Sequence, residues 1–138
     1  MLEDIRIAII VNPELPLGLL ANTVAAIGIG MAAKLPALAG RPLTDAAGRT
    51  IDASSCLPVP VLQGDATLIR ALLLKALETH QALALVPFPA FARSLHDFHD
   101  YQVQFPGRDL QQETLDGVGL AGPAKWIKSV TGALKLLR

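Results

Sequence analysis

The stretch Ile5-Arg6-Ile7-Ala8-Ile9-Ile10-Val11 decides the fold. It is rich in β-branched residues and almost continuously apolar, which is typical of a strand buried on both faces. A second apolar window, residues 15–33, follows a short loop and contains no charged residue between Glu14 and Lys34. We interpret this window as a long helix that packs against a sheet, with Pro16 and Gly18 at its entry.

By length, this apolar window could also cross a bilayer, which takes about 20 apolar residues. Its glycines and alanines lower its hydrophobicity, Asn22 and Thr23 fall on its second turn, and the sequence offers no second span. The chain opens on Glu3 and Asp4, where a signal peptide would carry basic residues. We therefore expect a cytoplasmic protein without membrane contact.

The rest of the chain alternates between strand and helix patterns. We predict a hairpin over residues 44–50, where Asp45 opens the turn and Gly48 supplies a positive φ angle. Asp65 is the expected cap of a helix. The predicted strands cover residues 59–62, 82–86 (closed by Pro87-Phe88-Pro89) and 115–121, and the predicted helices cover residues 66–80, 90–103 and 124–130. This alternation indicates an α/β sandwich with a mostly parallel sheet, in a single domain of residues 1–138.

The composition excludes several classes of protein. Hydrophobic residues make up 51% of the chain and charged residues 17%, which excludes a disordered chain. Lys and Arg number 12, as do Asp and Glu, so the formal net charge is zero and the whole protein does not attract nucleic acid or an anionic membrane. The one cysteine, Cys56, cannot form an internal disulfide or a thiolate metal cage, and we expect it to be a small buried side chain.

One histidine-rich segment has the spacing of a metal site. His96, His99 and Asp100 would lie at positions i, i+3 and i+4 of a helix and could converge on a divalent ion. The alternative is a solvated helix face, because Arg93 and Asp97 mix their charges with these residues. Two histidines without a second cluster favour this alternative, and we expect neither a metal nor a cofactor.

The charges are unevenly distributed. Residues 1–116 hold 8 basic and 12 acidic side chains, whereas residues 117–138 hold four basic side chains and no acid. Lys125 and Lys128 share one face of the last predicted helix, close to its start at Gly122-Pro123. Backbone N–H groups and two ammonium groups could hold a phosphate or carboxylate there. The alternative is a pair of ordinary exposed lysines at a chain end.

The run Gly117-Val118-Gly119-Leu120-Ala121-Gly122-Pro123, with the Val-Thr-Gly and Leu-Lys-Leu segments that follow it, resembles the end of the type 2 peptidyl-tRNA hydrolases. The helix entry from Asn12 to Asn22 and the Asp45–Gly48 hairpin look closer to a family of small bacterial proteins of unknown function in the same superfamily. This resemblance implies a three-layer α/β/α sandwich with a four-stranded mixed sheet, and often a homodimer.

The sequence departs from the hydrolase pattern at the catalytic positions. Those hydrolases carry a lysine in the loop that enters the first helix, but residues 15–19 contain none. Pro87 stands where they carry an aspartate, and Asn22 stands where they carry a glutamine. An ester hydrolase must polarise a carbonyl and position a water molecule. Substitute catalytic groups would have to come from residues such as Asn22, His96 or Asp97.

Three functions follow from these observations. In the first, the protein binds a small anionic or amide-bearing ligand in a cleft beside the first helix. In the second, it hydrolyses peptidyl-tRNA or a related acyl ester. It would then bind the acyl or peptidyl group and also the tRNA. In the third, its Ala/Gly-rich helix packs against a partner protein. The residues expected to line the ligand cleft are Asn12, Gly18, Asn22, Gly122, Lys125 and Lys128.

Overall fold

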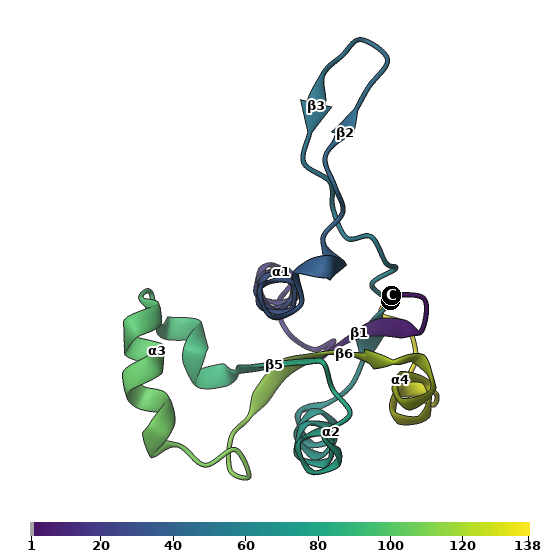
Figure 1. Cartoon of the computed structure of the whole chain (residues 1–138). Helices are drawn as coiled ribbons and strands as arrows, with labels where there is room; N and C mark the ends of the chain where they lie inside the picture. The colour runs from purple at the N-terminus through teal and green to yellow at the C-terminus, as the bar shows by residue number, and fades with distance from the viewer. Residues whose placement is uncertain (1) are drawn as a thin grey trace.

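A computed structural model describes residues 2–138 as a mixed α/β fold around one four-stranded sheet (Figure 1). The strand order across the sheet is β4-β1-β6-β5. The strands are β1 (Ile5–Val11), β4 (Val61–Gln63), β5 (Ala84–Pro89) and β6 (Leu115–Pro123). The predicted four-stranded mixed sheet is therefore confirmed.

The strand directions differ from the mostly parallel sheet that the alternation of strand and helix patterns predicts. β1 pairs with β4 in parallel, but β6 is antiparallel to both β1 and β5. The segment of residues 90–114 leaves the sheet and returns at the same end, since Pro89 pairs with Leu115. A strand that re-enters at the end where its predecessor left must run antiparallel. The expectation of a mostly parallel sheet is therefore wrong.

Helices cover both faces of the sheet (Figure 1). α1 (Leu17–Lys34) lies on one face, and α2 (Ala66–Thr79) and α4 (Ala124–Thr131) lie on the other. The sheet has a hydrophobic core on each face, and alternate side chains of β1 pack into one core or the other. Ile7 and Ile9 pack on the α1 side, and Ala8 and Ile10 pack on the side of α2 and α4. β1 is thus buried on both faces from Ile7 onward, as its sequence predicts.

Glycines in β6 allow α1 to come close to the sheet. A Cβ atom at Gly119 would lie 2.5 Å from Sδ of Met31 and would also overlap the side chain of Ile27. A Cβ atom at Gly117 would meet Ile27 and Thr23 at 3.1 Å. Thr23, Ile27 and Met31 are the buried residues of α1. The Gly-Val-Gly segment therefore forms the surface on which α1 rests.

The predicted hairpin is confirmed and projects from the body (Figure 1). It consists of β2 (Leu43–Thr44) and β3 (Thr50–Ile51), and Gly48 in its turn has a φ angle of +84°. Oδ1 of Asp45 accepts hydrogen bonds of 2.9 Å from the backbone N–H groups of Ala47 and Arg49. We call the projecting residues 41–52 the arm.

The segment after β5 differs from the prediction in two ways. β5 continues through Pro87 to Pro89, which an edge strand allows because one side of it needs no ladder hydrogen bond. The helix predicted over residues 90–103 is broken into η2 (Ala90–Ser94) and α3 (Phe98–Gln104). Asp97 caps α3 by accepting a hydrogen bond from the N–H of His99 at 2.8 Å. Short 3₁₀ turns also form at η1 (Pro36–Leu38) and η3 (Phe105–Gly107).

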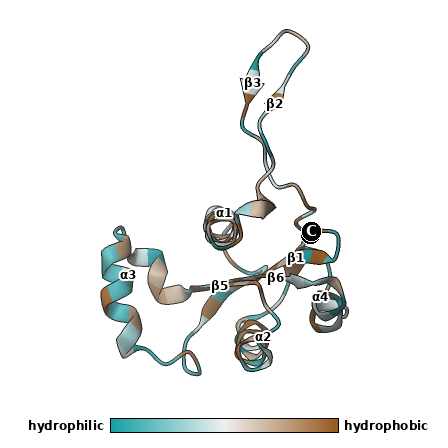
Figure 2. Cartoon of the chain, viewed as in Figure 1, coloured by the Kyte–Doolittle hydropathy of each residue, from teal (hydrophilic) through white to brown (hydrophobic). Residues whose placement is uncertain are grey.

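Two further expectations concern single features. Asp65 caps α2 as predicted, accepting from the N–H of Leu68 at 2.8 Å. Cys56 is exposed, so the expectation of a buried cysteine is wrong; its Sγ lies 3.1 Å from the carbonyl oxygen of Ala37. α1 is long and apolar enough to cross a membrane, but the structure packs one side of it against β5 and β6. Figure 2 shows that much of this helix is hydrophobic.

Candidate functional site

An ion pair between a buried aspartate and a partly exposed arginine lies where β6 begins. Asp116, the second residue of β6, is 1% exposed. Nε and Nη2 of Arg93 donate to its two carboxylate oxygens at 2.6 and 2.5 Å. This hydrogen bond to Asp116 raises the pKa of Arg93. The backbone carbonyl of Asp116 also accepts from the N–H of Asn12 at 3.0 Å, which places the pair beside the loop that leads into α1.

The side chain of Arg93 forms part of a polar cavity of about 380 Å³. Asn22 of α1 lines this cavity, as do His96 and Asp97 of the segment before α3. The structure thus brings together all three residues that the sequence suggested as catalytic candidates. The lining is completed by Phe88, Ala92, Leu95, Phe98 and Tyr101.

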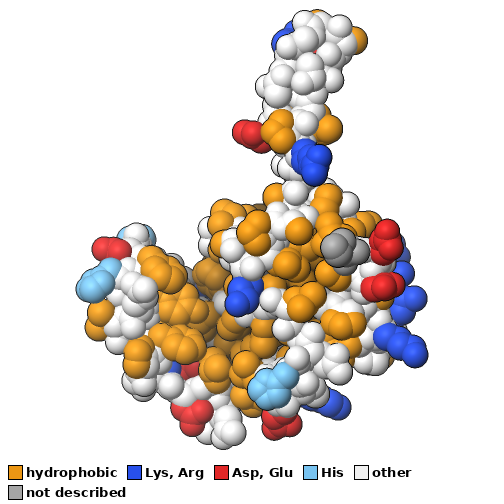
Figure 3. All heavy atoms as spheres, in the orientation of Figure 1, with side chains coloured by type: hydrophobic (Ala, Val, Ile, Leu, Met, Phe, Trp, Pro, Cys, Tyr) orange, Lys and Arg blue, Asp and Glu red, His pale blue; other side chains and the backbone are white. Residues whose placement is uncertain are grey.

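An apolar groove of about 890 Å³ adjoins the polar cavity. It lies between α1, β5 and α3, where Figure 3 shows a hollow surrounded by hydrophobic side chains. Phe88, Phe98 and Tyr101 line both the groove and the polar cavity. The other lining residues are Ala26, Ile27, Ile29, Gly30, Leu85, Val86, Pro87, Gln102, Phe105 and Pro106. Cavity and groove are therefore neighbours that share these three aromatic side chains.

Aromatic contacts hold the outer wall of the groove. The ring of Tyr101 lies 5.6 Å from that of Phe91 in an edge-to-face arrangement, and 5.8 Å from the rings of Phe98 and Phe105. The guanidinium carbon of Arg108 lies 4.0 Å from the centre of the Phe91 ring. Burial raises the pKa of Tyr101. Because α3 has no buried residue of its own, this aromatic cluster is what positions it.

Two other predicted ligand residues, Asn12 and Gly18, lie near this site without lining it. Oδ1 of Asn12 accepts from the N–H of Glu14 at 3.0 Å, and its carbonyl accepts from the N–H of Leu15 at 3.2 Å. Asn12 thus shapes the turn before α1. Gly18 is exposed in the first turn of α1, with no neighbouring atom within 4 Å of a Cβ built on it.

The remaining predicted ligand residues lie at the opposite end of the sheet. Pro123 pairs with Ile5, whereas Gly117 pairs with Val11, so six residues of strand, roughly 20 Å, separate the two ends. The N–H of Ala124, the first residue of α4, donates a hydrogen bond of 2.6 Å to the carbonyl of Asp4. The prediction that Gly122, Lys125 and Lys128 share one cleft with Asn22 is therefore wrong.

The i, i+3, i+4 spacing predicted for His96, His99 and Asp100 requires one continuous helix, and the helix is broken before α3. His96 precedes the cap of α3, whereas His99 and Asp100 lie inside it. The three residues therefore do not share one helix face. Within residues 2–138, no group of three or more His, Cys, Asp or Glu side chains is arranged to hold a metal ion.

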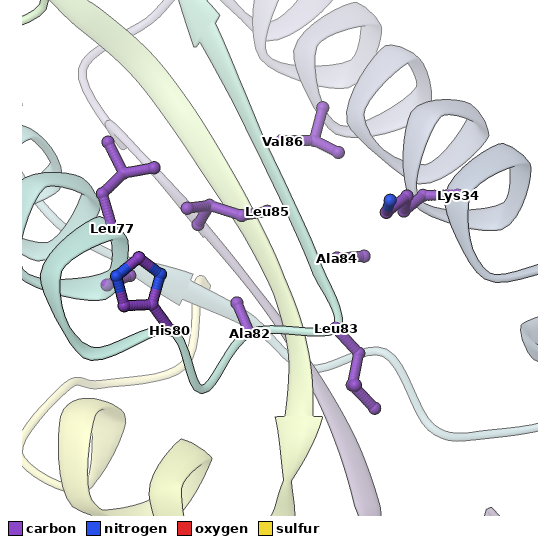
Figure 4. A pocket seen from close by; sticks show the side chains of 9 residues that line it. Lys34, Leu77, His80, Ala82, Leu83, Ala84, Leu85 and Val86 are labelled. Carbon is purple, nitrogen blue, oxygen red and sulfur yellow. The ribbon is translucent and has the colours of Figure 1, made fainter.

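A further hollow of about 350 Å³ lies at the start of β5. Its lining is mostly aliphatic, with Lys34 and His80 as its two ionisable residues. Figure 4 shows that Lys34 comes from α1 and His80 from the end of α2, with β5 between them. Their nitrogen atoms do not converge, so this hollow offers no polar site comparable to the one at Arg93.

Arg93, Asp116 and Tyr101 are the site residues that sequence reasoning missed. Asp116 gave one usable signal, because it is an acid inside the otherwise apolar strand pattern of residues 115–121. A charged residue in such a strand is almost always paired. Its partner, Arg93, lies 23 residues earlier and has no local signature.

Comparison with known proteins identifies the family and leaves its activity open. No curated protein matches the sequence. The structure is similar to that of Atu0240, a protein of unknown function from Agrobacterium tumefaciens strain C58. The TM-score is 0.83 and the identity 25%, over 96% of this chain and 97% of that one. Residues 5–138 match the model of DUF2000, a family of proteins of unknown function, and the chain belongs to that family.

Proposed function

We propose that this protein binds a small amphipathic ligand beside α1. The head group, a carboxylate or an amide, occupies the polar cavity at Arg93 and Asn22. The apolar body lies in the groove between α1, β5 and α3. The observation that supports this proposal is that the polar cavity and the apolar groove adjoin each other and share Phe88, Phe98 and Tyr101.

The donor groups at the polar end support the choice of head group. Arg93 uses Nε and Nη2 for Asp116, and within residues 2–138 no hydrogen bond involves its Nη1. Its side chain is 41% exposed and is held in one orientation by a buried carboxylate. Asn22 adds an amide that both donates and accepts. An oxygen of a carboxylate or an amide matches these donors.

The size and lining of the groove support an apolar body for the ligand. Small-molecule sites typically measure about 300–1,000 Å³ and combine apolar walls with a few polar groups. The groove has a volume of about 890 Å³, and its walls are aliphatic and aromatic, with Gln102 as their one side-chain amide. The polar groups lie at one end only. This asymmetry favours a molecule with one polar head.

The scaffold is also part of the proposal. We assign the fold to the three-layer α/β/α sandwiches of the type 2 peptidyl-tRNA hydrolase superfamily. Support comes from the helices on both faces of the mixed sheet and from the Gly122-Pro123 start of α4.

The binding proposal is tested by calorimetric titration with octanoate and octanamide, which share one chain and differ in the head group. We expect the wild-type protein to bind at least one of them and Asn22→Ala to weaken that binding about tenfold, or about 1.4 kcal/mol. Lys125→Ala, at the far end of the sheet, is the control and should bind like the wild type. Absence of binding to both probes, or equal binding by Asn22→Ala, contradicts the proposal.

Hydrolysis of peptidyl-tRNA or a related acyl ester is the second candidate. The convergence of Asn22, His96 and Asp97 on one cavity favours it, because these groups could position a water molecule at a bound carbonyl. The test is turnover of a defined peptidyl-tRNA by the purified protein, with Asn22→Ala as its control. Turnover no faster than in buffer excludes this candidate and leaves the binding proposal unaffected.

A further inference from the structure

The charges at the polar cavity narrow the choice between the two head groups of the proposed ligand. The ionisable residues that line this cavity are Arg93, His96, Asp97 and Tyr101. With histidine counted as neutral at pH 7, as in the net charge of the whole chain, Arg93 is the cation among them and Asp97 is the anion. Asp116, the partner of Arg93, adds a second negative charge. One positive charge therefore stands against two negative ones at this end of the site.

The positive charge of Arg93 is already neutralised by its partner. Its Nε and Nη2 atoms donate to the two carboxylate oxygens of Asp116 at 2.6 and 2.5 Å. A second arginine, Arg108, lies over the ring of Phe91 and pairs with Glu113 at 3.3 Å. Neither arginine offers an unpaired charge to an anionic head group. Arg93 can still donate a hydrogen bond through Nη1, which has no partner among residues 2–138.

Asp97 carries the unpaired negative charge of the cavity. Its Oδ1 accepts the capping hydrogen bond from the N–H of His99 at 2.8 Å, whereas its Oδ2 has no hydrogen bond in the part of the chain that the structure describes. None of the ion pairs among those residues includes Asp97. At physiological ionic strength charges act on one another over about 8 Å. A carboxylate that accepted from Arg93 inside the 380 Å³ cavity would therefore be repelled by Asp97.

We propose, as a refinement that rests on the proposed function, that Asp97 selects an uncharged carboxamide head group and rejects a carboxylate. The carbonyl oxygen of a carboxamide accepts from Arg93, and its N–H group donates to Asp97. A carboxylate lacks the N–H donor, and an ammonium group lacks the acceptor. The class of ligand is therefore a primary amide on an apolar chain.

The apolar groove supplies no charge that would reverse this preference. Tyr101, which the groove shares with the cavity, is the one ionisable residue in its lining. Lys34, the single charged residue of α1, follows Asn22 by 12 residues, or about 18 Å of helix. An anionic head group at Asn22 therefore gains nothing from this lysine.

Three probes with the same eight-carbon chain test the selection by charge. Octanamide is neutral, octanoate is an anion and octylammonium is a cation. Calorimetric titration of the full chain is done at about pH 8, where an imidazole in water is uncharged. We expect the wild type to bind octanamide at least about tenfold more tightly than either charged probe.

Asp97→Asn removes the charge and keeps the cap of α3, because asparagine caps helices as well as aspartate does. In this variant the affinity for octanoate should rise about tenfold and that for octylammonium should fall about tenfold. The affinity for octanamide should change by less than about threefold, since the asparagine carbonyl still accepts from its N–H group. Asp52→Asn makes the same change of net charge on the exposed arm and should leave all three affinities unchanged.

The outcomes separate this refinement from the proposed function. Octanoate or octylammonium that binds the wild type as tightly as octanamide does would overturn the selection by Asp97 and leave the proposed ligand site standing. The same holds if Asp97→Asn keeps the wild-type preference, or if Asp52→Asn changes it equally. Absence of binding to octanamide and octanoate alike overturns the proposed function and the refinement together.

Discussion

The guanidinium group of Arg93 donates two hydrogen bonds, of 2.6 and 2.5 Å, to the buried carboxylate of Asp116. Arg93 belongs to the turn after β5, and Asp116 belongs to β6. The pair therefore joins the edge of the sheet to its centre. Through the carbonyl of Asp116 it also reaches Asn12 and the entry of α1. The polar end of the proposed site is thus anchored in the core.

Loss of this ion pair should strongly destabilise the protein. Arg93→Ala leaves the buried carboxylate of Asp116 without its partly exposed partner, and the loss of the two hydrogen bonds should cost about 1–3 kcal/mol. Urea denaturation measures the change in the free energy of unfolding. Arg49→Ala, which breaks the exposed pair with Asp45 on the arm, is the control and should leave that free energy nearly unchanged. Equal effects of the two changes would show that the pair of Arg93 and Asp116 stabilises the fold no more than an exposed ion pair does.

The close approach of α1 to β6 predicts a steric effect. Gly119→Ala places a methyl group against Ile27 and Met31, and we expect it to lower the free energy of unfolding by about 1–3 kcal/mol. Gly18→Ala adds the same methyl group in open space on a helix and should raise that free energy by up to about 1 kcal/mol. Thermal unfolding of the two variants compares them directly. A Gly119→Ala protein as stable as the wild type would mean that α1 is not held against the glycines.

The pKa of the Tyr101 phenol depends on how deeply this side chain is buried in the wall of the groove. It is the single tyrosine, so the rise of phenolate absorbance with pH belongs to it alone. Burial raises its pKa in the folded protein, so the folded state retains this proton more strongly than the unfolded state. The contribution of Tyr101 to stability is therefore present below the ordinary pKa of 10.0 and is lost as the pH rises through the folded pKa. We expect the phenolate to form at higher pH in the native protein than in denaturant; coincident curves would place Tyr101 in open solvent.

The two lysines of α4 should not matter for ligand binding. Lys125 and Lys128 lie at the end of the sheet opposite the polar cavity. We expect Lys125→Ala/Lys128→Ala to bind octanoate or octanamide with unchanged affinity in the calorimeter. A loss of binding in this double variant would move the ligand site to the start of α4.

Local patterns in the sequence predict the elements better than their arrangement. The β-branched run of β1, the capping aspartate of α2 and the turn at Gly48 each act through neighbouring residues, and the structure confirms them. The direction of β6 could not be predicted in this way. It depends on the path of residues 90–114, whose return to the sheet no local propensity encodes.

The same limit applies to the site. The sequence offers Asn22, His96 and Asp97 as substitute catalytic groups without showing whether they meet, and the structure places them around one cavity. The three residues lie together because the helix predicted over residues 90–103 is broken before α3. Asp97 caps the start of α3 and is not part of a continuous helix. The sequence analysis places Gly122 and the α4 lysines in one ligand cleft with Asn22. The antiparallel pairing of β1 and β6 separates them.

The most direct test of the proposed site is a nitrogen-15 NMR titration of the wild-type protein with octanoate and, separately, octanamide. If the head group binds at Arg93 and the chain lies in the groove, the amide signals of Asn22, Arg93 and Tyr101 will shift together, and those of Gly122 and Lys125 will stay in place. Shifts confined to Gly122 and Lys125, or no shifts with either probe, would contradict the account.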